Sequence, residues 1–549
     1  MMRVRLERYV LPLILLLAQG GLLDITRVAA AQRQAAQSDA SVDILIRGGL
    51  VVDGTGRAPF TGDVAVKDGR ITEVGQLDAT SAETIIDAQG LVVAPGFIDV
   101  HTHADRVART PDAENFTRMG VTTIVAGNCG SSVVDVGEAL REIERTKVAL
   151  NVATLVGHNT VRATVMGRAR RPPTDRELER MRAMVAQAMR DGAIGLSTGL
   201  EYVPGTYAET PEIVALAEEA CRSGGLYTTH MRNEGTAVER AVTEAIEVGR
   251  QASCPVQISH LKIDSPSRWG RSTQLLQAIQ DAQQAGVDVR ADQYAYAASS
   301  SSLSIRFPSW VLEGGAAAIE KRLADTETWQ RIQKEIRATL TERGFKDFAF
   351  AIVASHEADP SVNGLSIADI AEKRHGSRSL EHQLEVARAL MRAGGARMVY
   401  HVMSEEDVRR IMRDPSVAVA SDASVLELGD GVPHPRGYGN TARLLAHYVR
   451  ETQTLQLEEA VRKMTSLPAS HFGFRDRGVI EAGARADLVL FDQKQVDAPS
   501  TFEKPHAYAT GIPHVLVNGV FVIRDDKPTG ARPGMVLKGG SDVGDKVTR

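Results

Sequence analysis

The stretch Ala94-Pro95-Gly96-Phe97-Ile98-Asp99-Val100-His101-Thr102-His103 decides the fold predicted for this chain. A proline and a glycine end the preceding segment, and the apolar run 97–100 predicts a short buried strand. Residues two apart on a strand point to the same side, so His101 and His103 project together from its carboxyl end. Two imidazoles on a rigid backbone form half of a metal site, although an isolated pair fits ordinary polar residues at a strand end equally well.

The composition is that of a large globular protein. The chain has 549 residues, 43% hydrophobic and 24% charged, enough for a sizeable core with additions. A formal net charge of -5 and the absence of a dense Lys/Arg tract argue against a nucleic-acid partner. Three cysteines cannot supply a disulfide framework, and the sequence carries no signal for an oligomeric state.

The amino terminus differs from the rest of the chain. Three arginines precede the apolar run 9–18, and Ala29-Ala30-Ala31 precedes Gln32. This order is typical of a secretory signal peptide over residues 1–31. An uncleaved anchor is the alternative, but the apolar run is short for a membrane span. We therefore expect an exported protein, periplasmic or secreted, with no membrane attachment after cleavage.

Both ends of the chain predict short strands joined by tight turns. Residues 42–93 alternate strand-like runs with Asp-Gly and Gln-Gly turns, and residues 475–530 contain further runs at 486–492 and 514–523. We infer one small β-domain, a β-sandwich formed from both segments, with the middle of the chain inserted between them.

The middle of the chain alternates strand-like and helical segments, which indicates parallel β–α–β units. Eight strand-like runs predict an α/β fold, a TIM-like (β/α)8 barrel over residues 94–302 and 366–474. Residues 303–365, between strands seven and eight, carry amphipathic helical patterns. We predict that they form an inserted segment over the barrel mouth, with helices packed on the outside as the alternative.

Metal-type ligands follow most of the predicted barrel strands, at the ends where barrel enzymes place their active sites. In chain order, these strand-end residues are His101 and His103, Cys129, His158, His230, His260, Asp292 and Asp422. A chance scatter of histidines would have no reason to choose those ends. The nitrogen and sulfur ligands among them suit Zn²⁺, and the predicted metal set is His101, His103, Cys129, His230 and His260.

Cys129 carries the most weight in this set. An unpaired thiol in an exported protein is liable to oxidation unless it is buried or bound to a metal. Burial as a small hydrophobe is the commoner fate of a lone cysteine, but the strand-end position favours metal binding. Cys221 and Cys254 precede the fifth and sixth strands instead and are interpreted as structural.

Taken together, these motifs resemble those of the N-acyl-D-amino-acid deacylase (D-aminoacylase) family of the amidohydrolase superfamily. The similarity spans nearly everything after residue 42. The motifs that carry it are APGFIDVHTH at Ala94, GNCG at Gly127, GHNT at Gly157, GLSTGLEYVPGTYA at Gly195, THMRNE at Thr229, ISHLK at Ile258, SDAS at Ser421 and HPRGYG at His434. Most amidohydrolases bridge two metals with a carboxylated lysine on strand four, which here reads AIGLSTG and contains no lysine.

The resemblance implies zinc-dependent hydrolysis of a small-molecule substrate, an N-acyl-D-amino acid. It implies a tightly held zinc, with the ligands Cys129, His230 and His260. A second, weaker metal position would involve His101 and His103. Asp422 would be the general acid/base, taking a proton from the metal-activated water and delivering it to the departing amine.

Four further residues match family positions that contact the carboxylate of the acylated amino acid: Lys262, Tyr294, Ser300 and Arg436. An arginine suits this role because its planar fork binds a carboxylate in two places. The seventh strand departs from the family, which often has proline between the two tyrosines of Tyr294-Ala295-Tyr296. His158 and His401 are interpreted as core or supporting residues rather than ligands.

Two alternative functions stay open at this point. The first is cyclic-amide hydrolysis, as in dihydroorotases and hydantoinases, and the missing lysine on strand four argues against it. The second is a non-catalytic secreted metal-binding protein, and the complete ligand set together with Asp422 argues against that.

The order of charged start, apolar run and alanine triplet predicts export followed by cleavage. The mature chain should begin near Gln32, because small residues directly precede that position. Amino-terminal sequencing of protein recovered from the periplasm or the medium measures this. Protein found entirely in the cytoplasm with Met1 intact would contradict the prediction.

Overall fold

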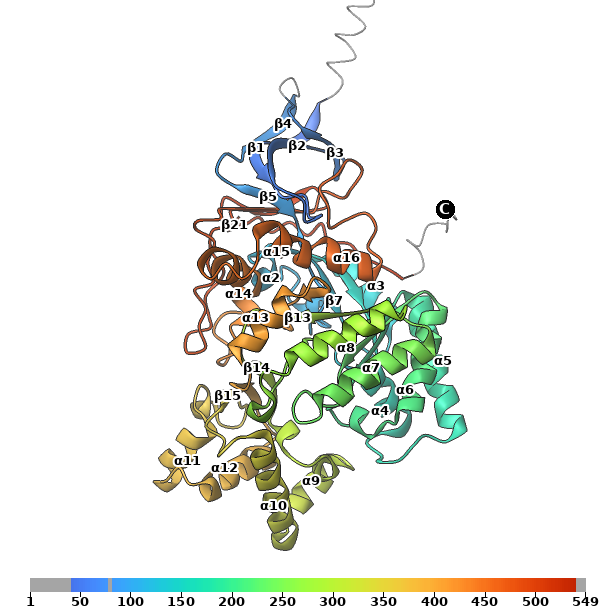
Figure 1. Cartoon of the computed structure of the whole chain (residues 1–549), viewed down its shortest axis with the longest axis vertical. Helices are drawn as coiled ribbons and strands as arrows, with labels where there is room; N and C mark the ends of the chain where they lie inside the picture. The colour runs from blue at the N-terminus through green and yellow to red at the C-terminus, as the bar shows by residue number, and fades with distance from the viewer. Residues whose placement is uncertain (1–40, 78–80, 540–549) are drawn as a thin grey trace, which may run out of the picture.

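The structure is a computed structural model that describes residues 41–77 and 81–539. Figure 1 shows strands from the amino-terminal end at one end of the molecule, a barrel in the middle and a helical part at the other end. The predicted signal peptide, residues 1–31, lies outside the described residues. Within the described residues, the structure contains no helix with the length and apolar character needed to cross a membrane.

One nine-stranded sheet combines strands from both ends of the chain. Its order is β21-β20-β19-β18-β5-β1-β2-β3, and β4 pairs with β1. At a bulge near Gly48, whose φ of 70° suits glycine, β1 (Val42–Val51) changes partner from β4 (Ala82–Asp87) to β5 (Val92–Pro95). The other strands are β2 (Phe60–Lys67), β3 (Arg70–Gly75), β18 (Leu488–Phe491), β19 (His514–Val517), β20 (Val520–Arg524) and β21 (Lys527–Pro528).

The carboxyl-terminal strands join this sheet through β18, which pairs antiparallel with β5 in the register Val489 to Ala94. An apolar cluster fills the space that the folded sheet encloses, and its members come from both chain ends, among them Ile46, Val64 and Leu488. The small β-domain predicted from both ends of the chain is therefore present.

Eight parallel strands form the barrel when β8 and β9, one segment interrupted at Leu155, are taken together. They lie in two sheets, β6-β7-β8 and β9-β10-β11-β12-β13-β17. The Leu155 N–H donates to the Ala126 carbonyl at 2.9 Å, which joins the two sheets. The last strand returns to the first through a Thr102–Ala423 bridge, where the His103 N–H donates to the Ala423 carbonyl at 2.8 Å. The predicted TIM-like fold is confirmed, and these contacts link its strands into a ring.

The barrel strands have the following bounds: β6 (Phe97–Asp99), β7 (Val121–Ala126), β8 (Asn151–Thr154), β9 (Val156–Gly157), β10 (Gly195–Gly199), β11 (Leu226–His230), β12 (Val256–Ile258), β13 (Val289–Gln293) and β17 (Val417–Val419). The helices that accompany them include α3 (Val136–Thr146), α4 (His158–Met166), α5 (Asp175–Asp191), α6 (Thr210–Arg222), α7 (Val238–Ala252), α8 (Ser272–Gln284), α13 (Glu405–Arg413), α14 (Arg436–Arg443), α15 (Leu457–Met464) and α16 (Ser466–Phe472).

The helix α5 shows how the sequence sets these boundaries. Thr174 and Glu177 form a capping box at its start, and Gly192 takes the left-handed conformation at its end. Its buried residues, among them Met181 and Val185, recur at helical spacing and face the core.

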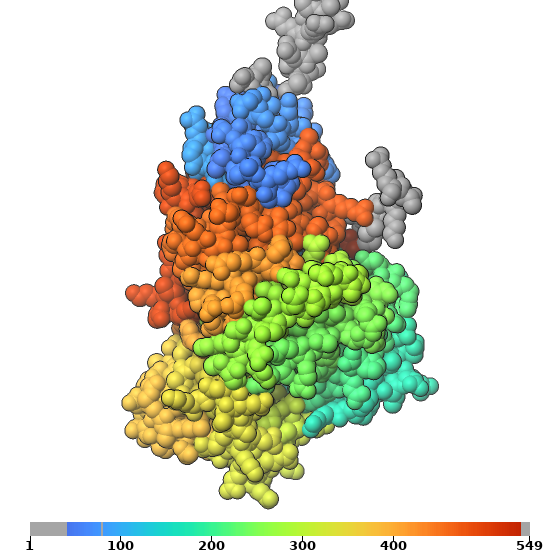
Figure 2. All heavy atoms as spheres, viewed as in Figure 1, coloured from blue at the N-terminus to red at the C-terminus, as the bar shows by residue number. Residues whose placement is uncertain are grey.

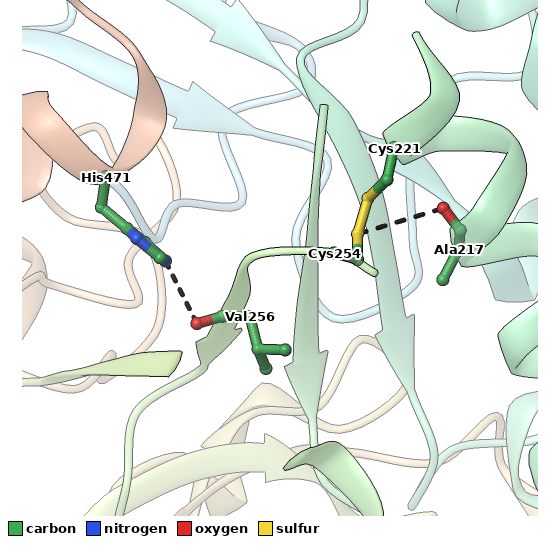
Figure 3. Close-up of a disulfide and its surroundings, with 5 residues drawn as sticks. All are labelled: Ala217, Cys221, Cys254, Val256 and His471. Carbon is green, nitrogen blue, oxygen red and sulfur yellow. Dashed lines mark hydrogen bonds between the residues drawn. A yellow bond between two sulfur atoms is a disulfide. The ribbon is translucent and has the colours of Figure 1, made fainter. Parts of the chain in front are cut away.

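A disulfide joins Cys221, in the last turn of α6, to Cys254, just before β12 (Figure 3). The two Cα atoms lie 5.6 Å apart, and the Sγ of Cys254 lies 4.0 Å from the Ala217 carbonyl. The bond links the segments that lead into β11 and β12. Both cysteines therefore have the structural role predicted for them, although the sequence did not predict that they form a disulfide with each other.

A separate module, residues 299–400, lies between β13 and β17 and is called the inserted module. It contains a three-stranded sheet with the order β14-β16-β15. Its elements are β14 (Ser299–Ser302), α9 (Ala316–Ala324), α10 (Thr326–Arg343), β15 (Ala351–Ser355), α11 (Ile367–His375), α12 (Leu380–Arg392) and β16 (Arg397–Tyr400). In Figure 2 the module forms the yellow mass at one end of the molecule, next to the green and orange surfaces.

The inserted module extends further than the predicted segment 303–365. Residues 366–400, which were assigned to the barrel, belong to the module because β16 pairs antiparallel with both β14 and β15. Pairing between distant strands does not change the local periodicity of the sequence. The predicted carboxyl-terminal boundary of the inserted segment, residue 365, was therefore too early.

Candidate metal centre and active site

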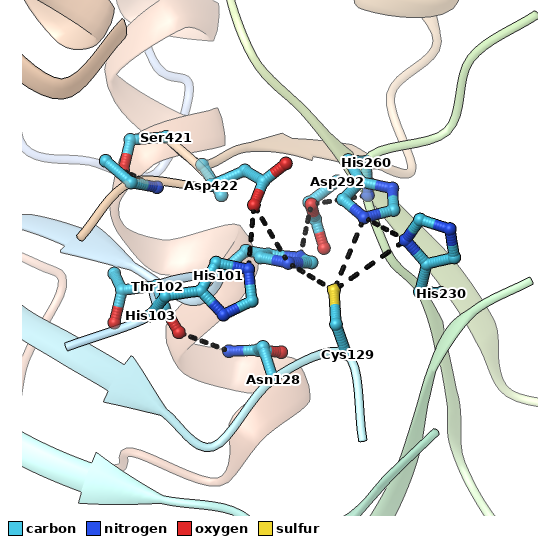
Figure 4. Close-up of polar contacts among 12 residues, drawn as sticks. His101, Thr102, His103, Asn128, Cys129, His230, His260, Asp292, Ser421 and Asp422 are labelled. Carbon is cyan, nitrogen blue, oxygen red and sulfur yellow. Dashed lines mark hydrogen bonds and ion pairs between the residues drawn. The ribbon is translucent and has the colours of Figure 1, made fainter. Parts of the chain in front are cut away.

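The predicted metal ligands converge at the carboxyl ends of neighbouring strands (Figure 4). The Sγ of Cys129 lies 3.3 Å from His101 Nε2, 3.5 Å from His260 Nε2 and 3.8 Å from His230 Nδ1. His230 Nδ1 and His260 Nε2 are 2.9 Å apart. These sulfur and nitrogen atoms lie close together, and they do not carry enough protons for all of them to hydrogen-bond to one another. Such an arrangement is typical of ligands that surround a small cation.

Two overlapping ligand groups share the thiol of Cys129. In one group it joins His230 and His260, and in the other it joins His101 and His103. Within each group the ligand atoms lie within 4.8 Å of one another. The geometry therefore offers two adjacent metal positions with a common sulfur ligand.

The backbone takes strained conformations to bring these groups together. Cys129, His260 and Asp422 have φ angles of 53°, 36° and 54°, in the left-handed region that side chains other than glycine rarely adopt. Such conformations cost about 1–3 kcal/mol each and cluster at functional sites. Next to Cys129, a Cβ on Gly130 would lie 2.2 Å from Asn159 Oδ1, so only glycine fits the turn.

The surroundings of Cys129 favour the thiolate, which is the form that binds metals. Burial by itself opposes ionisation of the thiol. The nearby charges of His101 and His260 outweigh burial and hold the pKa of Cys129 well below its usual range. The second position also lies beside a negative charge, because His103 Nε2 is 3.1 Å and His101 Nε2 is 3.6 Å from Asp422 Oδ1.

Asp422 faces the metal ligands with one oxygen and a cation with the other. Its Oδ2 lies 2.9 Å from Arg436 Nη1, and both side chains are buried. Burial raises the pKa of the Asp422 carboxyl, but the Arg436 guanidinium brings it well below its usual range. The group is therefore an ionised carboxylate at the edge of the ligand cluster.

Two further aspartates fix the strand ends. Asp292 Oδ1 accepts the backbone N–H of His260 at 2.8 Å and lies 3.3 Å from His101 Nδ1. Asp99 Oδ1 accepts the backbone N–H groups of His101 at 3.3 Å and Ser421 at 3.0 Å. They bind the ends of the first, sixth and eighth strands into one frame. The sequence placed Asp292 at a strand end but assigned a role to neither residue.

Glu234 is a buried carboxylate that the sequence interpretation missed. Its Oε1 lies 3.0 Å from His260 Nδ1 and accepts a hydrogen bond from Lys262 Nζ at 2.6 Å. Lys262 Nζ also lies 2.8 Å from His260 Nδ1. This carboxylate contacts the far side of a predicted metal ligand, as carboxylates beside metal-bound histidines commonly do. Its motif, THMRNE, was the available signal.

Glu201 and Tyr202 were missed in the same way, within the motif GLSTGLEYVPGTYA. Glu201 Oε2 lies 3.2 Å from His230 Nε2. The hydroxyl of Tyr202 lies 3.3 Å from His230 Nδ1, and the two rings are 4.5 Å apart. Both side chains therefore position His230 from the loop after β10.

A cavity of about 770 Å³ opens onto the ligand cluster. Residues of the inserted module line it together with the barrel ends, so the module covers the barrel mouth. Of the predicted substrate contacts, Lys262, Ser300 and Arg436 line this cavity. Ser300 lies at its module side and donates its hydroxyl to the Met398 carbonyl at 2.9 Å.

Tyr294 lies behind the cavity wall and supports the two cations. Its ring centre is 4.6 Å from the Arg436 guanidinium carbon and 5.8 Å from Lys262 Nζ. Three of the four predicted substrate contacts therefore line the cavity, and Tyr294 contacts two of them.

Neither His158 nor His401 joins the metal ligands within the described residues. His158 Nε2 lies 2.8 Å from Glu212 Oε1, in the core. His401 packs against Phe502 with ring centres 4.7 Å apart. Both placements agree with the prediction that neither residue is a metal ligand; His158 is a core residue as expected, whereas His401 is exposed and is not.

A (β/α)8 barrel with a thiolate, histidines and a carboxylate at its strand ends defines a metal-dependent hydrolase. Residues 84–523 match the model of the Amidohydrolase family, and the chain belongs to this family. The chain is 37% identical over 520 residues to an N-acyl-D-glutamate deacylase of Alcaligenes xylosoxydans xylosoxydans, covering 90% of this chain and 96% of that relative. It is 35% identical over 526 residues to a D-aminoacylase of the same organism, covering 91% and 99%.

Solved structures agree with this family assignment. An N-acyl-D-glutamate deacylase from Bordetella bronchiseptica, complexed with zinc and a phosphonate inhibitor, matches with a TM-score of 0.78 and 35% identity over 91% of this chain and all of that one. A D-aminoacylase matches with a TM-score of 0.78 and 34% identity over 90% of this chain and 100% of that one. A D-hydantoinase, at 16% identity and a TM-score of 0.53, shares the fold alone over 90% of this chain and 98% of that one. The predicted family and the predicted metal-dependent amidohydrolase are confirmed.

The geometry predicts that Cys129→Ala loses the tightly bound metal and nearly all hydrolytic activity. A three-ligand site has no spare ligand to replace the thiolate. Elemental analysis of the purified protein and an activity assay measure both effects. A matched control removes the other two sulfurs with Cys221→Ala/Cys254→Ala, which should keep metal and activity. Full metal occupancy in Cys129→Ala would contradict the assignment.

Proposed function

We propose that this chain is an exported, zinc-dependent deacylase that hydrolyses the amide bond of N-acyl-D-amino acids, releasing a carboxylic acid and a free D-amino acid. One observation carries the proposal: the Asp422–Arg436 pair, with 2.9 Å between Oδ2 and Nη1, stands directly beside the sulfur–histidine ligand cluster. It combines a proton carrier and a carboxylate-binding cation at one metal site.

The ligand chemistry supports zinc. Cys129, His230 and His260 supply one sulfur and two nitrogens, and a catalytic zinc keeps a further position open. His101 and His103, which share the same sulfur, would hold a second, weaker metal. When bound, zinc lowers the pKa of a water molecule towards about 7 and polarises the scissile carbonyl.

Asp422 is placed to move the proton. Its carboxylate is ionised and lies against His103 on one side and Arg436 on the other. It can accept a proton from the attacking water and then deliver it to the departing amine.

The cations beyond Asp422 hold the substrate carboxylate. Arg436 and Lys262 approach the ring of Tyr294, and Ser300 lies on the module side of the same cavity. The metal and the cations define two points on the substrate, the scissile carbonyl and the α-carboxylate. The side chain at the α-carbon is the third point, which makes the site sensitive to handedness. The preference for the D form follows from the relatives.

Cyclic-amide hydrolysis is less well supported. β10 contains no lysine to bridge two metals, and the likeness to hydantoinases is one of fold alone. A non-catalytic metal-binding protein gives no reason for a buried, ionised Asp422 beside the ligands.

Export is part of the proposal. Residues 1–31 have the order of a signal peptide. The Cys221–Cys254 disulfide supports it, because disulfides persist in oxidising compartments.

The experiment that tests this function is a screen of the purified protein, supplied with zinc, against paired N-acetyl-D- and N-acetyl-L-amino acids. The D forms should be hydrolysed faster, because inverting the α-carbon moves the side chain away from the space available beside two fixed contacts. Release of free amino acid measures the rate. Faster hydrolysis of the L forms, or ring opening of hydantoins without deacylation, would contradict the proposal.

Asp422→Asn should keep zinc and the fold while lowering kcat. The amide is similar in shape but cannot carry the proton, and losing a general acid/base typically costs about 10²–10⁴-fold. Steady-state kinetics with metal analysis separate lost chemistry from lost metal. Near-normal turnover at neutral pH would mean that another group carries the proton.

A further inference from the structure

Asn115 is a buried asparagine on the segment that connects the first barrel strand to the second. It lies in the short helix α2 (Glu114–Thr117), is 0% exposed and does not line the catalytic cavity. The residue before the helix, Ala113, has a φ of 42°, a left-handed conformation that alanine rarely adopts. A buried amide is stable only when its donors and its acceptor are bonded, so the partners of Asn115 indicate its role.

The side chain of Asn115 bonds the backbone of two segments that are far apart in the sequence. Its Nδ2 donates to the Ser424 carbonyl at 3.1 Å and to the Gly437 carbonyl at 2.9 Å. Its Oδ1 accepts the Leu426 N–H at 3.3 Å. Both N–H groups and the carbonyl of the amide are therefore used, all of them on main-chain atoms.

The two bonded segments carry the acid and the cation of the site. Ser424 follows Asp422 by two residues, and Gly437 directly follows Arg436. The 2.9 Å separation between Asp422 Oδ2 and Arg436 Nη1 depends on how these segments lie relative to each other. A single amide is bonded to both of them.

The backbone around Asp422 is also held by the first barrel strand. The Asp422 N–H donates to the His101 carbonyl at 2.8 Å, and the His103 N–H donates to the Ala423 carbonyl at 2.8 Å. Asn115 follows the same strand. The first strand and the segment after it therefore hold the acid through the backbone and the start of α14 through the asparagine.

We propose that Asn115 is a positioning residue of the reaction. By holding the carbonyls of Ser424 and Gly437, it keeps Asp422 in place for proton transfer and Arg436 in place for the α-carboxylate of the substrate. The inference rests on the proposed function and adds to it a residue outside the cavity. Without the amide the two segments shift relative to each other, and an error of about 1 Å in the placement of reacting groups can lower the rate about a hundredfold.

A double-mutant cycle tests the link to Asp422. Asn115→Leu keeps nearly the same shape and removes all three hydrogen bonds. It should lower kcat for N-acetyl-D-leucine by about ten- to a hundredfold while zinc content stays unchanged. In the Asp422→Asn background the same change should lower kcat far less, because the group that it positions no longer carries a proton. Equal factors in the two backgrounds would overturn the inference.

The link to Arg436 is tested by comparing N-acetyl-D-leucine with its α-amide, which lacks the carboxylate. The wild-type enzyme should have the higher kcat/KM for the acid, and Asn115→Leu should reduce this preference because Arg436 is displaced. The inference requires this result as well as the cycle. An unchanged preference for the acid in Asn115→Leu would contradict it.

The matched control is Asn151→Leu, which removes a buried amide at the start of β8, at the opposite ends of the barrel strands. Asn151 is also 0% exposed; its Nδ2 donates to Asp487 Oδ2 at 3.0 Å, and its Oδ1 accepts from Asn518 Nδ2 at 2.8 Å. The control should lower the Tm but keep the wild-type kcat and the preference for the acid. A fall in kcat as large as that of Asn115→Leu would overturn the inference, because any lost buried amide would then have the same effect.

The remaining outcomes separate this inference from the proposed function. Wild-type turnover of N-acyl-D-amino acids together with an unchanged kcat in Asn115→Leu would overturn the inference alone. No turnover of any N-acyl-D-amino acid by the wild-type enzyme would overturn both. Should Asn115→Leu fail to fold, Asn115→Ala, which leaves room for water, must show the same non-additivity with Asp422→Asn for the inference to hold.

Discussion

The placement of the Cys129 sulfur among three imidazoles is the constraint on which the rest of the site depends. At these distances the lone pairs of the sulfur and of the imidazole nitrogens repel one another unless a cation or protons lie between them. The chain accepts left-handed backbone at Cys129, His260 and Asp422 to keep them there. Strain of this kind persists only where the surrounding structure holds it, and the barrel supplies that support.

The support comes from buried acids that join different strands. Asp99 and Asp292 fix the backbone at the ends of the first, sixth and eighth strands, while Glu234 holds the outer nitrogen of His260. Burial raises the pKa of Glu234, but Lys262 and the adjacent histidines bring it well below its usual range, so its negative charge lies close to the cluster. Buried acids thus set the geometry of the centre and contribute to its electrostatics. The disulfide between Cys221 and Cys254 fixes the opposite ends of two ligand-bearing strands.

Much of this arrangement could be predicted from the sequence. The strand β7 lies at the residues expected for it, 121–126, and the five predicted metal ligands are brought together. The alternation of buried strands with amphipathic helices is a local signal that predicts the barrel. The rule that active-site residues follow the carboxyl ends of barrel strands then predicts the ligands. What escaped prediction depends on contacts between distant segments. β16 pairs across the inserted module, Glu234 and Tyr202 act through neighbours in space, and the two structural cysteines meet each other.

X-ray absorption at the zinc edge of the purified mature protein is the most direct test of the central claim. The account predicts a first shell with a single sulfur at about 2.3 Å and nitrogens at about 2.0–2.1 Å. The sulfur contribution should disappear in Cys129→Ala and persist when the disulfide cysteines are replaced. A shell of nitrogen and oxygen alone in the wild-type protein would contradict the account, because Cys129 would then not be a ligand.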